Sequence, residues 1–137
     1  MIFEKKSTRT RLSFDVAIRQ LGGSSIVLDI GDIHLGAGNE SLSDTSKTIA
    51  LYVDALVLRV NNHKDIVEMA KSSSIPIING LSNISHPCQV MADLMTFLEC
   101  KGDFTNKKFV WFGDYNNVTS SWVQASAKFN FKFVISS

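Results

Sequence analysis

The sequence carries almost no net charge and contains no long apolar run, and both absences narrow the range of partners. Lys and Arg number 14 against 13 Asp and Glu, which leaves a formal charge of +1 over 137 residues. Without a long basic run, we expect no nucleic acid and no membrane as a partner. No stretch reaches the roughly 18 apolar residues of a membrane-spanning helix, and the N-terminus lacks the layout of a signal peptide. We therefore expect a cytoplasmic protein.

The usual sequence signatures of metal and nucleotide sites are also missing. The two cysteines, Cys88 and Cys100, do not stand at metal-ligand spacing from the three histidines, so we expect free thiols and no metal. The sequence places no base for Cys88, which favours packing over a nucleophilic role. Gly113 and Asp114 follow an apolar segment, but the G-x-G-x-x-G pattern is absent, so the indication of a nucleotide is weak. We expect no cofactor.

Apolar segments rich in β-branched residues alternate with segments of helical spacing along the whole chain. The expected strands cover residues 1–3, 25–29, 55–60, 75–80, 108–113 and 131–135, and the expected helices cover residues 7–21, 43–53, 62–73, 86–98 and 121–128. This alternation predicts an α/β fold, a parallel sheet with helices on both faces. Because a new strand-led unit follows residues 99–107, we predict one domain over residues 1–102 and the start of a second over residues 103–137.

Two of the expected helices carry an apolar face that we predict to be buried. The residues of this face are Phe14, Ala17, Ile18 and Leu21 in the first helix, and Val90, Met91, Leu94, Met95 and Leu98 in the fourth. The pair Gly22 and Gly23 is expected to end the first helix.

The start of the first helix is the strongest candidate for a binding site. Hydroxyl and guanidinium groups that can bind an anion belong to Ser7, Thr8, Arg9 and Thr10. Unpaired backbone N–H groups and the positive end of the helix dipole favour an anion there, and Arg9 can hold a phosphate with two hydrogen bonds. From this short pattern alone, a plain N-cap with exposed arginines is an equally good interpretation.

Further polar candidates follow other expected strands. Arg59 lies in an otherwise apolar strand, where an unpaired guanidinium would cost several kcal/mol, so we expect it to face an anionic ligand or an acid. His86 begins a helix and could donate to an oxygen that develops negative charge, although a lone histidine is more often a surface group. Gln89, one turn on, can face the same way. Since ligands gather at the carboxyl ends of parallel strands, one site could collect these groups.

Together these residues resemble the aspartate/ornithine carbamoyltransferase family, and within it the ornithine branch. Three motifs carry the resemblance: residues 3–11 (FEKKSTRTR) are similar to the carbamoyl phosphate motif, residues 58–60 (LRV) to the arginine strand, and residues 86–89 (HPCQ) with Ala92 and Asp93 to the second motif. The FEK lead-in, the cysteine of HPCQ and residues 113–117 (GDYNN) favour the ornithine over the aspartate branch. The resemblance extends over essentially the whole chain.

The resemblance implies an enzyme that transfers the carbamoyl group of carbamoyl phosphate to the δ-amine of L-ornithine. The phosphate would be held by the four residues Ser7, Thr8, Arg9 and Thr10. Arg59 would bridge the phosphate and the carbonyl oxygen, and Thr10 and His86 would help it to polarise that oxygen. Gln89 would hold the carbamoyl amide.

The resemblance also implies how ornithine binds and how the protein assembles. Asn117 would contact ornithine from the second domain, and His34 is similar to a position that reaches a neighbouring subunit's site. The implied assembly is a homotrimer with active sites at subunit interfaces. The implied role is arginine biosynthesis, a part of amino-acid biosynthesis, although the sequence leaves the catabolic direction open. Arg11 is expected in a structural ion pair instead of the site.

Two other interpretations stay open at this point. The family's N-terminal helix and most of the ornithine site would lie outside these 137 residues, so we expect a fragment whose activity alone is in doubt. An aspartate carbamoyltransferase, or a transcarbamylase for a modified ornithine, would share the phosphate motif. A non-catalytic phosphate-binding domain would also keep it, but that interpretation is weakened because Arg59, His86 and Gln89 are all present.

Overall fold

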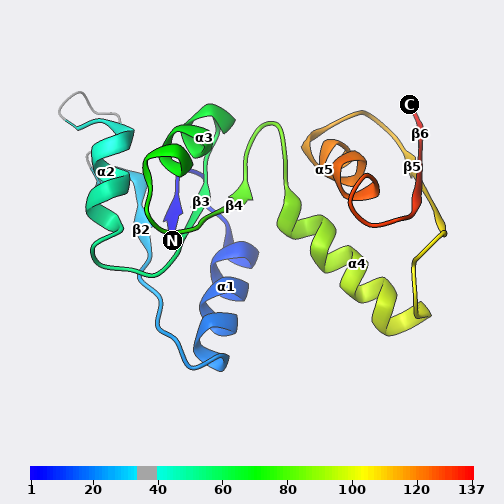
Figure 1. Ribbon diagram of the computed structural model, residues 1–137, viewed down its shortest axis with the longest axis horizontal. Coiled ribbons are helices and arrows are strands. Elements are labelled where there is room, and N and C mark those ends of the chain that lie inside the picture. The colour runs from blue at the N-terminus through cyan, green and yellow to red at the C-terminus, as the bar shows by residue number, and fades with distance from the viewer. Residues whose placement is uncertain (34–39) are drawn as a thin grey trace. The chain divides into compact units, whose positions relative to one another are not determined.

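The computed structural model describes residues 1–33 and 40–137, which divide into two compact units, residues 1–80 and 81–137 (Figure 1). The elements of the first unit are β1 (Ile2–Phe3), α1 (Thr8–Gln20), β2 (Leu28–Asp29), the 3₁₀ helix η1 (Ile30–Asp32), α2 (Leu42–Ile49), β3 (Leu56–Arg59), α3 (His63–Ser72) and β4 (Ile77–Leu81). The last residue of β4 already belongs to the second unit.

The strands of the first unit form a sheet in the order β2-β1-β3-β4. β1 runs parallel to both of its neighbours, with Phe3 opposite Asp29 on β2 and opposite Arg59 on β3. Just after β1, the backbone N–H of Glu4 donates to the carbonyl oxygen of Arg59 at 2.9 Å. This register fixes the chain that leads into α1 beside the end of β3.

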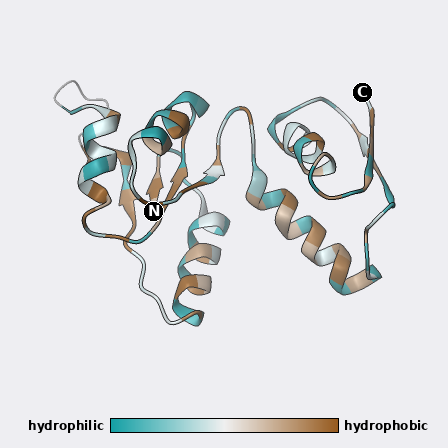
Figure 2. Ribbon diagram, viewed as in Figure 1, coloured by the Kyte–Doolittle hydropathy of each residue, from teal (hydrophilic) through white to brown (hydrophobic). Residues whose placement is uncertain are grey.

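The core of the first unit lies between the sheet and the helices α2 and α3. Ile66 and Met69 of α3 pack with the buried strand residues Ile2 and Leu58, and the strands of this sheet are among the most hydrophobic parts of Figure 2. Successive strand residues point to opposite faces of a sheet, so Phe3 points away from this core. Phe3 instead lines a pocket together with residues of α1. The predicted fold class, a parallel sheet with helices on both faces, is therefore confirmed.

The second unit is built on aromatic side chains. Its elements are α4 (Pro87–Lys101), β5 (Lys108–Phe112), α5 (Asn117–Ser126) and β6 (Lys132–Ser136), and β5 pairs in parallel with β6. Trp122 stacks on Phe133 with ring centroids 5.6 Å apart, and Phe109 lies 5.0 Å from Trp122. Val90 and Leu94 of α4 join this cluster. Helix α4 thus packs on the elements that follow it in the chain, and the predicted domain boundary near residues 99–107 stays a prediction.

The predicted buried face of α1 is wrong in part. Phe14 and Ile18 are half-buried, but Ala17 and Leu21 are exposed, Leu21 to 85%. The helix does end at the expected place, because Gly22 adopts a φ of 85°, which glycine tolerates best.

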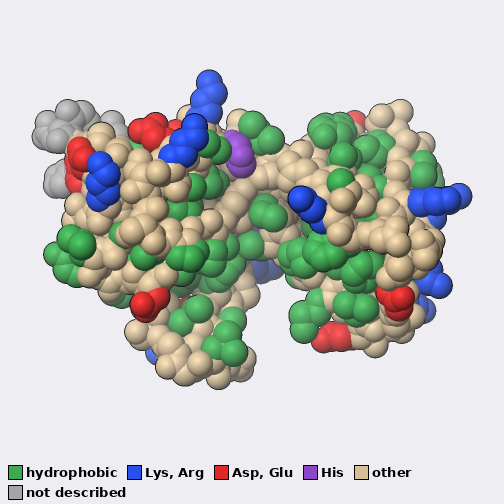
Figure 3. All heavy atoms as spheres, in the orientation of Figure 1, with side chains coloured by type: hydrophobic (Ala, Val, Ile, Leu, Met, Phe, Trp, Pro, Cys, Tyr) green, Lys and Arg blue, Asp and Glu red, His purple; other side chains and the backbone are tan. Residues whose placement is uncertain are grey.

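The predicted buried face of α4 is also wrong in part. Val90 and Leu94 are buried, whereas Met91, Met95 and Leu98 are exposed, Met95 to 60%. Hydrophobic side chains reach the surface in both units, as the space-filling view shows (Figure 3).

Candidate active site

The first turn of α1 has the features of an anion site that its sequence predicts. Ser7 is the N-cap, with an extended backbone at φ −153°, and its hydroxyl accepts from the backbone N–H of Thr10 at 3.3 Å. No acidic residue lies in this turn. The positive end of the helix dipole and the first backbone N–H groups are therefore not neutralised by the helix itself.

Arg59 meets this turn from the end of β3. Its Nη1 donates to Oγ1 of Thr10 at 3.1 Å, across 49 positions of sequence. Its Nε is buried and donates to no atom of residues 1–33 and 40–137. Within the same residues, neither Arg59 nor Arg9 forms a salt bridge with a carboxylate. The guanidinium is thus held in place by a hydroxyl and retains donors for an anion.

The electrostatics of Arg59 also favour an anionic ligand. Burial lowers the pKa of its guanidinium, and the positive charge of Arg9 lowers that pKa further. Two like charges near each other raise the free energy of the unliganded site, and an anion placed between them would remove that repulsion. The arrangement therefore favours a ligand with negative charge.

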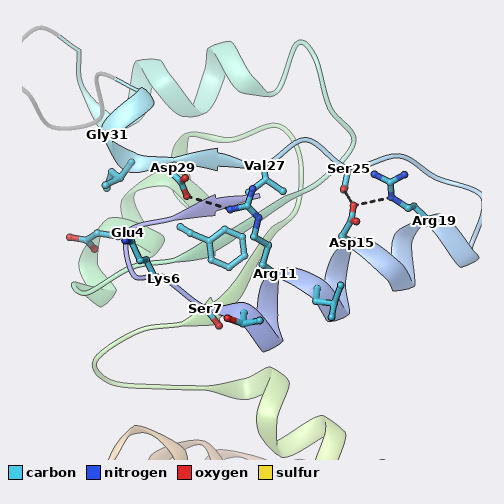
Figure 4. A pocket seen from close by; sticks show the side chains of 14 residues that line it. Glu4, Lys6, Ser7, Arg11, Asp15, Arg19, Ser25, Val27, Asp29 and Gly31 are labelled. Atoms are coloured by element: carbon cyan, nitrogen blue, oxygen red, sulfur yellow. Dashed lines mark hydrogen bonds and ion pairs between the residues drawn. The ribbon is translucent and has the colours of Figure 1, made fainter.

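A pocket of about 780 Å³ adjoins this turn on the side of β2. Ser7 and Thr8 line this pocket, whereas Arg9, Thr10 and Arg59 do not. The pocket therefore lies beside the group formed by Arg9 and Arg59. The other labelled side chains include Glu4, Lys6, Arg11, Asp15, Arg19 and Asp29 (Figure 4).

Arg11 occupies this pocket as part of an ion pair. Its Nη1 lies 4.0 Å from Oδ1 of Asp29, and Figure 4 shows the two side chains pointing toward each other. The predicted ion pair of Arg11 is therefore confirmed. Both side chains are more than half exposed, so the pair contributes at most about 1 kcal/mol to stability.

Three predicted residues lie in the second unit, where two of them use their amide groups locally. His86 is the N-cap of α4, and its backbone N–H donates to Oγ of Ser121 at 2.7 Å. Gln89 is exposed, and its Nε2 donates to Oδ1 of Asp93, one turn further along α4, at 2.8 Å. Asn117 donates from Nδ2 to the carbonyl oxygen of Ser82 at 2.8 Å. Gln89 and Asn117 can therefore offer a ligand their side-chain oxygens as acceptors.

The helix that carries Asn117 begins earlier than the sequence pattern predicted. We expected it from residue 121, but α5 spans Asn117–Ser126. Asn116 forms a capping box with Thr119, in which the side-chain oxygen of each residue accepts from the backbone N–H of the other. Asn117 consequently lies in the first helical turn and not in a loop.

The structure brings the predicted residues together in two groups. In the first unit, the turn that contains Ser7, Thr8 and Arg9 is joined to Arg59 through Thr10. In the second unit, Ser121 and Ser82 link His86 with Asn117. No sequence pattern indicates Ser121 or Ser82, because a serine in a helix or turn has no pattern of its own. His34 lies outside the described residues, and the convergence of the two groups stays a prediction.

The geometry of Cys88 favours packing over reactivity. Cys88 is half-buried, and burial raises the pKa of its thiol, which lowers the fraction of reactive thiolate. Within residues 1–33 and 40–137, no three His, Cys, Asp or Glu side chains are grouped in a way that could hold a metal ion. No helix in those same ranges has the length and apolar character needed to cross a membrane.

The fold is that of an α/β protein, and its candidate anion site lies at the start of a helix beside a strand-end arginine. Residues 1–99 match the sequence profile of the carbamoyl-P binding domain of aspartate/ornithine carbamoyltransferases. The chain belongs to the aspartate/ornithine carbamoyltransferase family.

Individual relatives agree with this assignment. The chain is 52% identical over 131 residues to the ornithine carbamoyltransferase of Rhodopseudomonas palustris strain BisA53, covering 96% of this chain and 42% of that protein. The structure of the Pyrococcus furiosus ornithine carbamoyltransferase matches with a TM-score of 0.92 and 46% identity, over 99% of this chain and 43% of that one. The Burkholderia thailandensis enzyme matches with a TM-score of 0.92 and 43% identity, over 98% and 46%. The chain thus spans less than half the length of these relatives.

Proposed function

We propose that the full-length protein is an ornithine carbamoyltransferase, which transfers the carbamoyl group of carbamoyl phosphate to the δ-amine of L-ornithine and gives citrulline and phosphate. The observation that carries this proposal is the hydrogen bond from Nη1 of Arg59 to Oγ1 of Thr10. It lies at the start of α1, near the positive charge of Arg9. No carboxylate of the described residues pairs with either arginine. The relatives reported above, all ornithine carbamoyltransferases by name, support the ornithine branch.

The phosphate of carbamoyl phosphate binds at the first turn of α1. Its ligands are the backbone N–H groups of this turn and the side chains of Ser7, Thr8, Arg9 and Thr10. A helix N-terminus without an acidic residue favours a dianion, and the planar guanidinium of Arg9 supplies two parallel hydrogen bonds. Arg59 lies close enough to Thr10 to reach the same ligand.

Arg59, Thr10 and His86 polarise the carbonyl oxygen. As the amine attacks, negative charge develops on that oxygen, and donors aimed at it stabilise the transition state more than the ground state. Loss of one such donor costs about 3 kcal/mol of transition-state stabilisation. The donors of the phosphate site act at the same time on the leaving group.

Gln89 and Asn117 orient the two substrates. The side-chain oxygen of Gln89 accepts from the carbamoyl amide, while its Nε2 stays on Asp93. The side-chain oxygen of Asn117 accepts from an ammonium group of ornithine, while its Nδ2 stays on Ser82. Holding amine and carbonyl carbon in contact supplies much of the remaining acceleration.

The reaction balances without a protein base. The δ-amine forms a bond to the carbonyl carbon, the bond from that carbon to the phosphate oxygen breaks, and the electron pair leaves with the phosphate. The departing phosphate takes the proton of the amine. No cofactor or metal takes part in this scheme.

The test of this function is a substrate comparison with the full-length protein. We expect citrulline from carbamoyl phosphate and L-ornithine, and no carbamoyl aspartate when L-aspartate replaces L-ornithine. Carbamoylation of aspartate but not ornithine would contradict the branch. Binding of carbamoyl phosphate with turnover of neither amine would contradict the enzymatic proposal and favour a phosphate-binding domain.

We further propose that the full-length protein is a cytoplasmic homotrimer in arginine biosynthesis, with active sites at subunit interfaces. Membership of the family supports this assembly, and a related structure, that of Campylobacter jejuni, is described as an anabolic ornithine carbamoyltransferase. Light scattering on the full-length protein should give three times the subunit mass. A monomer with full activity would contradict the interface sites.

A further inference from the structure

One buried hydroxyl in the second unit touches the backbone of two proposed substrate-binding residues. Oγ of Ser121, a residue that is 3% exposed, accepts from the backbone N–H of His86 at 2.7 Å. The same hydroxyl donates to the carbonyl oxygen of Asn117 at 3.1 Å. A serine within a helix often bonds only the carbonyl four residues before it. Ser121 makes that bond and in addition holds a backbone group 35 positions away.

The loop before His86 is fixed to the same helix from its other end. Nδ2 of Asn117 donates to the carbonyl oxygen of Ser82 at 2.8 Å, and Ser82 is fully buried. Within the loop, the N–H of Ser82 donates to the carbonyl oxygen of Ser85 at 2.9 Å, and the N–H of Ser85 donates to Oγ of Ser82 at 3.1 Å. The backbone of His86 is therefore held by α5 through Ser121 and by a closed turn that α5 also binds.

The geometry points to Ser121 as a positioning residue for His86 in carbamoyl transfer, an inference that rests on the proposed function. Ser121 does not contact substrate. Ser121 fixes the backbone N–H of His86, and thereby the position of its Cα. From that position the imidazole reaches the carbonyl oxygen of carbamoyl phosphate. A shift of about 1 Å in a catalytic group can cost about 100-fold in rate, so the precision of this bond matters for turnover. Ser121 also fixes the carbonyl of Asn117, and so couples the positions of the two residues.

The test compares Ser121→Ala with wild type in the full-length protein. We expect kcat for citrulline formation to fall at least 10-fold, because His86 loses its alignment with the developing oxyanion. KM for carbamoyl phosphate should change less than about 3-fold, since its phosphate is bound by the first turn of α1 and Arg59. Ser121→Thr keeps the hydroxyl and should restore kcat to within about 3-fold of wild type.

Ser46→Ala is the matched control for loss of a buried hydroxyl. Ser46 is 1% exposed and donates to the carbonyl oxygen of Met69 at 2.9 Å, within the first unit. The variant Ser46→Ala should lower the thermal midpoint about as much as Ser121→Ala does, and it should leave kcat unchanged. Activities are compared well below both midpoints and per folded molecule. Equal kcat of Ser121→Ala and wild type would overturn the inference, and so would an equal loss of kcat in Ser46→Ala.

Two further outcomes keep the inference separate from the proposed function. If Ser121→Ala does not fold, Ser121→Cys preserves the side-chain size with a weaker acceptor, and its kcat should lie below that of wild type. A Cys variant with wild-type kcat would then overturn the positioning role. If wild type makes no citrulline, the proposed function fails first. If wild type is active and Ser121→Ala is equally active, the positioning role alone fails.

Discussion

Arg59, a half-buried residue, is held at the end of β3 by a neutral hydroxyl, although a guanidinium shielded from water usually pairs with an acid. Its Nη1 binds Thr10, its Nε is buried without an acceptor among the described residues, and Arg9 adds a second positive charge nearby. Both burial and the like charge act against the unliganded state, in which the pKa of Arg59 is lowered. The residue is therefore better explained by a ligand that it binds than by the stability it provides.

This explanation predicts that Arg59→Met separates stability from activity. Methionine keeps much of the length of the side chain but removes the charge, the buried donors and the repulsion by Arg9. In the full-length protein, we expect an unchanged or higher thermal midpoint, and a fall in kcat/KM of about 100-fold to 1,000-fold, the range for loss of one oxyanion donor. Thermal unfolding and steady-state kinetics on the same preparations measure both.

Arg11→Met is the control for removing an arginine from the same region. Among residues 1–33 and 40–137, the salt bridge of Arg11 is to Asp29, at 4.0 Å and on the surface, so this change should alter kcat/KM less than about 3-fold. A drop in the midpoint of Arg59→Met that matches its loss of activity would argue for a structural arginine instead.

At the scale of single residues, the sequence predicts features that depend on neighbouring residues in the chain. Ser7 is a helix N-cap as its position suggested, and Arg59 interrupts an apolar strand. The tie between Ser121 and His86 was missed because it joins a helix interior to a turn 35 positions away. A hydroxyl can bond almost anywhere, so its partner depends on packing that no local pattern encodes.

At the scale of elements, periodicity identified apolar faces but not what covers them. In α4, Val90 and Leu94 pack on the aromatic cluster of the second unit, whereas Met91 and Met95 on the neighbouring stripe are exposed. Helical spacing reports which side of a helix is apolar. Whether another element lies against that side is a property of the packing, and sequence periodicity carries no information about it.

The start of α5 is marked in the sequence by the spacing of a helix-capping motif. Asn116 and Thr119 stand three residues apart, the spacing of a capping box, and the structure contains that box. This spacing indicates a helix that starts at residue 117 instead of residue 121. Asn117 would then have been recognised as a residue of the first helical turn.

α1 is tied to the segment that leads into β2 by a carboxylate, and this tie depends on pH. Asp15 of α1 accepts from the Ser25 hydroxyl and from Nε of Arg19, and the hydrogen bond from Ser25 is the main cause that lowers the pKa of Asp15. Because the pKa is lower in the folded than in the unfolded state, the stabilisation is complete above the unfolded value of about 3.9. It is lost progressively as the pH falls from that value through the lower pKa of the folded state.

We therefore predict a pH-dependent effect of Ser25→Ala. The thermal midpoint of the variant should lie below that of wild type at pH 7. The difference should shrink as the pH falls below about 4, because Asp15 then takes up a proton in the unfolded state before it does so in the folded state. Thermal unfolding followed from pH 7 to pH 3 measures it. Ser24→Ala, at the exposed neighbouring position, should match wild type throughout. A difference that is independent of pH would mean that Asp15 is not the partner that matters.

At the scale of the whole molecule, the proposed site draws residues from both compact units. Arg9 and Arg59 belong to the first unit, and His86, Gln89 and Asn117 to the second. The prediction that they serve one ligand comes from the rule that polar groups after parallel strands gather at one edge of a sheet, and from the family resemblance. The structure confirms the parallel sheet. That the residues of both units serve a common ligand stays a prediction, and it is the central claim of our account.

The most direct test titrates carbamoyl phosphate and inorganic phosphate into the full-length protein and follows the heat of binding. Arg9→Ala should weaken both ligands by about 100-fold, since a charged hydrogen-bonding partner of the phosphate is lost. Gln89→Ala should weaken carbamoyl phosphate by about 3-fold to 10-fold, the value of one hydrogen bond, and leave phosphate unchanged. Arg11→Ala should change neither. If Gln89→Ala binds carbamoyl phosphate as tightly as wild type does, the two units do not share one site and the account is wrong.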